Sequence, residues 1–141
     1  MASAPSLPLT GGCGCGAVRF EISAPLVGAA YCHCTRCQHR TGTAMQASAR
    51  IEPGSLSITK GEEHLRGWTL DTGLEKSFCE LCGSAVLARD RDDGEVKIVR
   101  LAAIDGDPGV RPAAHQFVAY AAPWAPIPDD GLPRFDERIP S

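Results

Sequence analysis

The sequence has no long hydrophobic run. No apolar stretch approaches the roughly 20 residues that a membrane-spanning helix needs. The N-terminal residues, MASAPSLPLTGG, lack both the basic region and the long apolar region of a secretion signal. We therefore expect a protein that does not associate with a membrane and that is located in the cytoplasm.

Runs of basic residues are also missing. The chain carries 14 lysines and arginines, spread along its length, against 17 aspartates and glutamates, which gives a formal net charge of -3. Proteins that bind nucleic acid through its phosphates concentrate positive charge in a patch or a stripe. The charge pattern therefore disfavours nucleic acid as a partner.

Long amphipathic helices, internal repeats and interdomain linkers are absent as well. Short stretches rich in apolar residues follow one another instead, each bounded by Gly, Pro or Asp, as is typical of strands joined by tight turns. The expected strands are residues 17–23, 26–31, 44–51, 55–59, 64–70, 75–79, 84–90, 95–104 and 115–122. Short helical turns are expected only at 35–40 and 107–114. The sequence thus predicts a mainly β, mostly antiparallel protein.

A chain of 141 residues fits a single domain. Residues 1–10 are rich in Pro, Ser and Ala, and we expect a disordered N-terminal tail there. Residues 11–125 are predicted to form the domain. Residues 126–141 are irregular but contain several large apolar side chains, so this C-terminal segment is expected to wrap the domain.

Cysteine is abundant and clustered. The seven cysteines follow the patterns C-x-C, C-x-C-x-x-C and C-x-x-C, and they are Cys13, Cys15, Cys32, Cys34, Cys37, Cys79 and Cys82. An odd number cannot all pair within one chain, and disulfides are rare in a reducing compartment. Such spacings are typical of metal-ligand loops, and thiolate ligation favours zinc over harder metals, with iron as the main competitor.

Two pairings of the cysteines are compatible with these spacings. Cys79 and Cys82 have the spacing of a zinc knuckle, and Gly83 permits the tight turn. We favour Cys13 and Cys15 as their partners, because small residues flank Cys15 and let the backbone bend. The alternative is a zinc ribbon made by Cys34, Cys37, Cys79 and Cys82, which would leave Cys13, Cys15 and Cys32 without a role.

In the favoured pairing, Cys32, Cys34 and Cys37 remain as a set of three. Three protein ligands are the number found in catalytic zinc sites, which keep one position for water or substrate. His39 is an alternative fourth ligand. His33 would point to the opposite side in an extended backbone, because it lies between two of the cysteines.

The segments GGCGCGAVRFEI, YCHCTRCQHRTGT and FCELCGS, in this order, resemble the glutathione-dependent formaldehyde-activating enzyme family, which is related to centromere protein V. The similarity extends over about residues 11–125. It implies an Mss-four-like β fold with two zinc ions. The resemblance also implies a structural zinc on Cys13, Cys15, Cys79 and Cys82, and a catalytic zinc on Cys32, Cys34 and Cys37.

The resemblance further implies carbon-sulfur lyase activity, the reversible addition of a thiol such as glutathione to formaldehyde. Three thiolates donate much negative charge to the metal, which favours binding and orientation of a thiol over strong activation of water. Arg36, His39 and Arg40 lie beside the expected site and are candidates for binding substrate carboxylates. His115 is a candidate acid or base if folding brings it to the metal. The alternative function is a noncatalytic zinc-stabilised β module that binds a protein partner.

Overall fold

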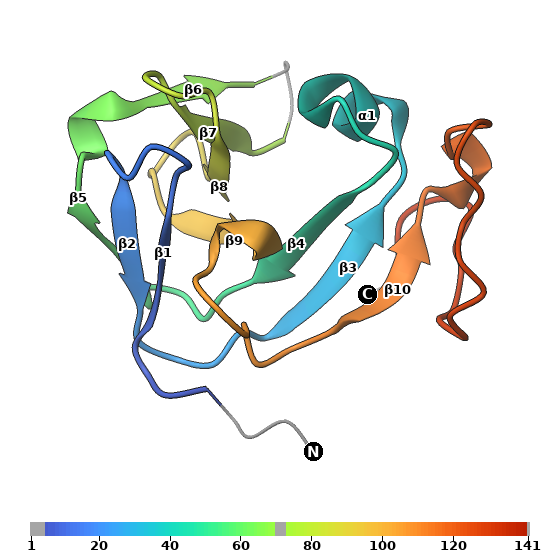
Figure 1. Cartoon of the computed structure of the whole chain (residues 1–141), viewed down its shortest axis with the longest axis horizontal. Coiled ribbons are helices and arrows are strands. Elements are labelled where there is room, and N and C mark those ends of the chain that lie inside the picture. Colours follow the sequence, from blue (N-terminus) through green and yellow to red (C-terminus); the bar gives the residue numbers. More distant parts are fainter. Residues whose placement is uncertain (1–4, 70–72, 141) are drawn as a thin grey trace.

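The computed structural model describes residues 5–69 and 73–140, and these residues form two β-sheets (Figure 1). The smaller sheet has the strand order β1-β2-β5. Its strands are β1 (Leu9–Gly12), β2 (Arg19–Ile22) and β5 (Leu56–Lys60). Both pairs of neighbouring strands are antiparallel.

The larger sheet has the strand order β10-β3-β4-β9-β8-β7-β6. Its strands in chain order are β3 (Gly28–Cys32), β4 (Gln46–Arg50), β6 (Leu65–Trp68), β7 (Glu75–Cys79), β8 (Ala85–Arg89), β9 (Val96–Arg100) and β10 (Pro112–Gln116). All neighbouring strands are antiparallel except β10 and β3, which run parallel. The prediction of a mainly β fold is therefore confirmed, with one parallel pair that was not predicted.

Helices are short throughout the described chain. The α-helix α1 (Thr35–Thr41) begins after Cys34, whose Sγ accepts the Cys37 N–H at 3.3 Å, and it ends at Gly42, which has a φ of 69°. The 3-10 turns are η1 (Glu62–His64), η2 (Leu101–Ala103) and η3 (Val118–Tyr120). Among the described residues, no helix has the length and apolar character needed to cross a bilayer.

Three local predictions were wrong. The strand expected to continue to residue 104 ends at Arg100, where η2 begins. The last strand ends at Gln116, because Phe117 takes a left-handed conformation with a φ of 58° and starts η3. Residues 107–114 are not a helical turn; the side chain of Asp107 accepts the Gly109 N–H, and the segment then enters β10.

The ends of the predicted domain can be compared with the strands of the structure. β1 begins at Leu9, two residues before the start that the sequence suggested, while residues 1–4 of the predicted tail and residue 70 of a predicted strand lie outside the described residues. Beyond Tyr120 the chain forms no further strand among its described residues. The division into a tail, a domain and a C-terminal segment stays a prediction.

The hydrophobic core lies between the two sheets. Phe20 and Ile22 of the small sheet and Leu87 and Val99 of the large sheet are fully buried. Side chains alternate between the two faces of a strand, so one face of the large sheet packs on the small sheet. The opposite face of the large sheet carries polar side chains, and α1 lies against β4 of this sheet.

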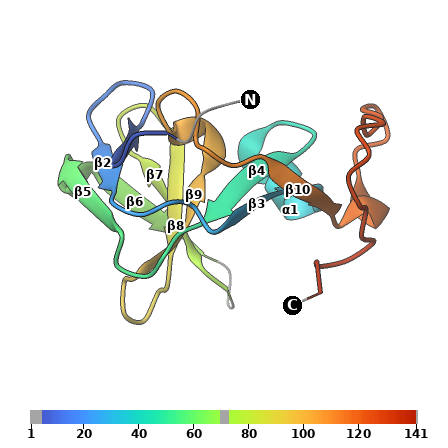
Figure 2. The ribbon, with the colours of Figure 1, turned by 90° about the horizontal axis from the view of Figure 1, so that it is seen from below.

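The C-terminal segment lies beside β10, at the edge of the large sheet (Figures 1 and 2). The Phe135 N–H donates to the His115 carbonyl at 2.9 Å, and the His115 N–H donates to the Pro133 carbonyl at the same distance. These bonds occupy backbone groups that an edge strand would otherwise expose. The segment therefore covers a sheet edge.

Candidate metal centres

Four cysteines from the two sheets meet in one cluster. The Sγ atoms of Cys13, Cys15, Cys79 and Cys82 all lie within 4.8 Å of one another. Cys13 and Cys15 lie in the turn between β1 and β2, and Cys79 and Cys82 bound the turn between β7 and β8. Cys13 and Cys79 are buried, whereas Cys15 and Cys82 are exposed. The cluster thus joins the small sheet to the large one at the border of the core.

Hydrogen bonds orient these sulfur atoms. The Val18 N–H donates to Cys13 Sγ at 3.2 Å. Ser84 Oγ lies 3.2 Å from Cys82 Sγ and accepts the Gly14 N–H at 2.9 Å, so one hydroxyl links both turns. Hydrogen bonding by the hydroxyl and the backbone of Ser84 lowers the pKa of Cys82 to about 5. The hydrogen bonds from Ser84 therefore favour a thiolate at Cys82.

The spacing of the sulfurs fits a tetrahedral zinc ion. Zinc–sulfur bonds of about 2.3 Å in tetrahedral geometry place the sulfurs about 3.8 Å apart. Cys13 Sγ lies 3.7 Å from Cys15 Sγ, and Cys15 Sγ lies 3.9 Å from Cys79 Sγ. The cluster can therefore bind one metal ion with four thiolates, which closes its coordination.

The second cluster consists of three cysteines from one short segment. The Sγ atoms of Cys32, Cys34 and Cys37 lie within 4.8 Å of one another, and the described residues supply no fourth histidine, cysteine or carboxylate to this group. Cys32 ends β3, Cys34 caps α1, and Cys37 lies in the first turn of α1. The cap brings Cys34 and Cys37 together, because the sulfur of Cys34 accepts the N–H of Cys37.

A hydrogen bond joins two of these sulfur atoms. Cys37 Sγ donates to Cys32 Sγ at 3.4 Å. This hydrogen bond lowers the pKa of Cys32 and, together with burial, raises the pKa of Cys37. A cation bound between the sulfurs would replace the proton, since metal ligation requires thiolates. The cluster can therefore bind one metal ion with three thiolates.

Both clusters flank the large sheet, but they differ in the face that they use. Cys79 pairs with Leu65 across β7 and β6, and both side chains are buried in the core.

Cys32 pairs with Gln46, and directly paired residues share a face. Ser48, two residues after Gln46, pairs with Arg100. Ile98, two residues before Arg100, pairs with Ala88, which in turn pairs with Lys76, the partner of Trp68. The face with Cys32 therefore carries polar and cationic side chains.

Four cations gather near the three cysteines on this face. Burial and then the positive charges of Arg100, Arg40 and Arg36 lower the pKa of Lys76, while the charge on Cys37 opposes the shift. Burial lowers the pKa of Arg100 to about 10, and Arg40 acts in the same direction. The guanidinium of Arg40 lies 5.8 Å from the centre of the Trp68 ring. The charges of the three arginines therefore act on Lys76, and the charge of Cys37 acts on Lys76 and Arg100.

Comparison with known proteins identifies the family. The model of the family described as glutathione-dependent formaldehyde-activating enzyme matches residues 8–120, which is more than half of the chain. The chain belongs to this family.

A crystal structure of a Rhodobacter sphaeroides protein, a structural genomics target, is similar in sequence and in fold. The two proteins share 26% identity, and the match covers 89% of this chain and 98% of the other, with a TM-score of 0.53. In this chain, the strands of both sheets lie within the residues that the family model matches.

The cysteine positions of this family member form the groups favoured from the sequence. The set of four and the set of three are separate clusters, each able to bind a metal ion. Cys34 and Cys37 do not form one cluster with Cys79 and Cys82, as a zinc ribbon would require, because the two pairs belong to different clusters. Whether these residues act as ligands stays a prediction.

The histidines lie in different places. His39 is exposed on α1. His33 is buried, and its Nε2 lies 2.8 Å from Nδ1 of His115, whose Nε2 lies 2.8 Å from Oδ2 of Asp130. Both ring nitrogens of His115 are thereby engaged away from the thiols. The His33–His115–Asp130 chain connects β3 to the C-terminal segment.

Of the predicted substrate residues, Arg36 and Arg40 lie near the three cysteines. Arg36 is exposed, whereas Arg40 is half-buried against Trp68. Sequence analysis missed Gln46, Lys76 and Arg100. Side chains alternate between the two faces along each strand, and this alternation indicated the face on which each of the three residues lies. Only the order of the strands in the sheet brings them near the cysteines.

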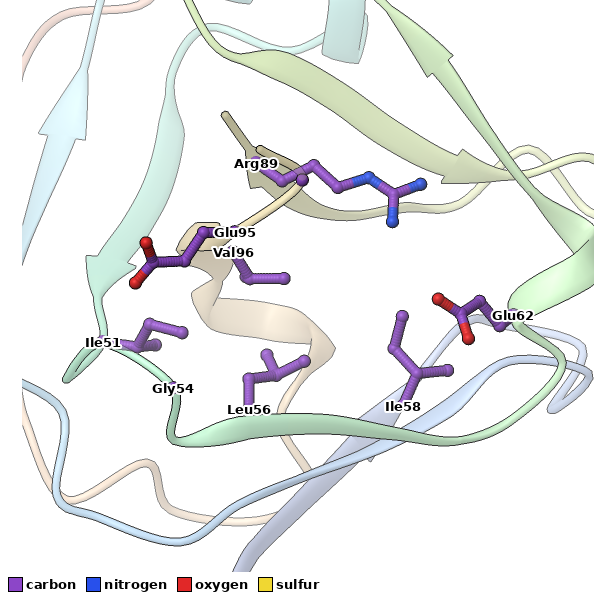
Figure 3. A pocket seen from close by; sticks show the side chains of 9 residues that line it. Ile51, Gly54, Leu56, Ile58, Glu62, Arg89, Glu95 and Val96 are labelled. Atoms are coloured by element: carbon purple, nitrogen blue, oxygen red, sulfur yellow. The ribbon is translucent and has the colours of Figure 1, made fainter. Parts of the chain in front are cut away.

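The cavity drawn in Figure 3 is lined by none of the residues named above for this polar face. It has a volume of about 290 Å³ and lies where β5 faces the ends of β8 and β9. Leu56, Ile58 and Val96 provide apolar walls, and Glu62 and Arg89 lie at its border. Neither cysteine cluster contributes a residue to its lining, so it plays no part in the metal centres.

Proposed function

We propose that this protein is a zinc-dependent carbon-sulfur lyase that adds a small thiol, such as glutathione, reversibly to formaldehyde or a related aldehyde. The observation that carries the proposal is the pair of unequal cysteine clusters. One offers four thiolates and so completes a tetrahedral zinc site. The other offers three beside a cationic face, which leaves one ligand position for a substrate.

The chemistry of the donors supports zinc in both clusters. Cysteine thiolates at these spacings suit a soft, tetrahedral ion. In the three-cysteine centre, bound zinc would hold a thiol as its more nucleophilic thiolate, or polarise the aldehyde oxygen. The four-cysteine centre would be structural, because all four of its ligand positions come from the protein.

The addition needs stabilisation of negative charge. A carbon–sulfur bond forms between the thiol and the aldehyde carbon, the carbonyl π bond breaks, and the proton of the thiol ends on the aldehyde oxygen. Negative charge lies first on sulfur and then on oxygen. Arg40 on α1, with Lys76 and Arg100 on the sheet, can stabilise both charges, since the charge of Cys37 acts on all three. The same residues stabilise the reverse reaction.

The first test is the metal content of the purified protein. We expect two zinc ions per chain in the wild type and one in a double variant with Cys34→Ser and Cys37→Ser, with the circular dichroism spectrum retained. The matched control is a Cys15→Ser and Cys82→Ser variant, which removes two exposed ligands of the other cluster. One zinc in the wild type would contradict the two-centre proposal.

The second test is exchange of ¹³C-formaldehyde with its thiol adduct, measured by NMR with glutathione and with several other cellular thiols. We expect exchange that depends on the wild-type protein and disappears in the Cys34→Ser, Cys37→Ser variant. Absence of protein-dependent exchange with all thiols and aldehydes tested would refute the lyase. The alternative, a noncatalytic module that binds a protein partner, would then be favoured.

A further inference from the structure

Buried polar atoms without partners lie beside the three-cysteine cluster. In the described part of the chain, four buried side-chain nitrogen or oxygen atoms have no hydrogen-bond partner. Three of them are Arg40 Nη1, Gln46 Oε1 and Arg100 Nε, and the fourth, Ser77 Oγ, lies on the core face. The Arg100 residue is only 8% exposed. Leaving a buried donor without a partner is costly, and more so when it belongs to a charged group.

The strand register brings these atoms close to the sulfurs. Gln46 pairs directly with Cys32, and its Nε2 lies 3.6 Å from Cys37 Sγ. Arg100 is on β9, two strands from β3, which corresponds to about 9.6 Å between backbones. Its Nη1 donates to Ser48 Oγ at 2.7 Å, on β4 between those two strands. The side chain of Arg100 therefore extends toward β3.

The thiolates do not account for all of this positive charge. Three thiolates and one Zn²⁺ carry a formal charge of -1, whereas Arg36, Arg40, Lys76 and Arg100 carry +4. A thiolate bound at the fourth position would change the charge of the centre to -2. The face still has an excess of two positive charges. An anion from the substrate would reduce this excess.

The burial of the cations restricts where that anion is located on the substrate. Arg36 is exposed and can bind a distant charge on a long substrate. Arg100 is buried, and Arg40 has a buried nitrogen, so the group that they bind must also be buried next to the cysteines. A carboxylate has two acceptor oxygens and matches guanidinium donors.

We propose that the substrate of the three-cysteine centre carries a carboxylate within a few bonds of the atom that reacts there, and that Arg100 and Arg40 bind this carboxylate. This inference rests on the proposed thiol and aldehyde chemistry. The carboxylate can come from the aldehyde, as in a 2-oxo acid, or from the thiol, as in a mercapto acid. Formaldehyde carries none, so it would need an acidic thiol as its partner.

The experiment compares acidic and neutral probes of similar size on the zinc-loaded protein. Mercaptoacetate is compared with 2-mercaptoethanol by calorimetry, and glyoxylate is compared with acetaldehyde by NMR of adduct exchange. We expect a preference of about 10- to 100-fold for the acidic member of at least one pair, as suits hydrogen bonds to a charged group. The pair that shows the preference identifies which substrate carries the carboxylate.

The variant Arg100→Gln should abolish this preference while the zinc content stays the same. Arg111→Gln is the control, since Arg111 is exposed and pairs with Asp107 away from the cysteines. The ¹⁵Nε resonance of Arg100 should shift in the wild type when the preferred acidic probe binds. If Arg100→Gln fails to fold, Arg40→Gln and this resonance still test the proposal.

Two failures are distinguishable. Equal affinities within both pairs, with adduct exchange retained, would overturn the carboxylate site and leave the lyase standing. Carboxylate-dependent binding without adduct exchange would refute the lyase while retaining an acid-binding site. A preference that persists in both Arg100→Gln and Arg40→Gln would overturn the assignment of the arginines.

Discussion

The two cysteine clusters should contribute unequally to stability, and matched serine variants can measure the difference. Cys15→Ser removes an exposed cysteine from the four-cysteine cluster, and Cys34→Ser removes a cysteine from the three-cysteine cluster. Serine keeps the cap of α1 at position 34, because its hydroxyl can accept the same N–H. The comparison therefore isolates the metal links.

The expected difference follows from the chain lengths that each metal would close. Cys15 and Cys79 are 64 residues apart, whereas Cys32 and Cys37 are 5 apart. With closure entropy scaling as (3/2)RT ln n, the longer link contributes about 2 kcal/mol more to the free energy of unfolding. The four-cysteine cluster also joins the two sheets, so its loss affects core packing as well.

Urea unfolding followed by circular dichroism, at fixed protein and zinc concentrations, measures this difference. We expect Cys15→Ser to lower the free energy of unfolding by at least about 2 kcal/mol more than Cys34→Ser. Zinc content is measured on the same samples, and we expect each variant to hold one ion fewer than the wild type. Equal losses of stability, or a larger loss for Cys34→Ser, would refute the assignment of the structural role to the four-cysteine cluster.

Other contacts give further predictions. Ser84→Ala should weaken metal retention by the four-cysteine cluster about 10- to 100-fold in a chelator competition, because its hydroxyl orients Cys82; unchanged retention would contradict this. Leu87→Ala should lower the free energy of unfolding in urea by about 2–5 kcal/mol, since the side chain is fully buried, and a loss near zero would exclude its core role. A hydrogen bond from His115 lowers the pKa of Asp130 below its ordinary value of 3.8. The contact therefore stabilises the fold fully at pH values above 3.8, and this stabilisation is lost as the pH falls through the lowered pKa of the folded state. Asp130→Asn should speed amide exchange of Phe135 at pH 7 and remove this acid dependence, whereas unchanged exchange would show that the contact does not hold the segment.

Local patterns predicted most of the strands. The alternation around Phe20, for example, correctly placed a half-buried strand, and the helical turn after Cys34 is α1. Predictions failed where a single backbone conformation ended an element, as at Phe117. Side-chain type gave no warning there, since a positive φ is unusual for phenylalanine.

The sequence alone determined the residues that could bind metal and their grouping over short distances, because only one or two residues separate neighbouring cysteines in each motif and keep their sulfurs close together. Tertiary structure decided which groups meet. It brought Cys13 and Cys15 to Cys79 and Cys82, which a ribbon pairing would have separated. It also gathered Arg40 of α1 with Lys76 and Arg100 of the large sheet, which are scattered along an acidic chain, near the three cysteines. Strand order and register set such meetings, and they depend on how the whole core packs.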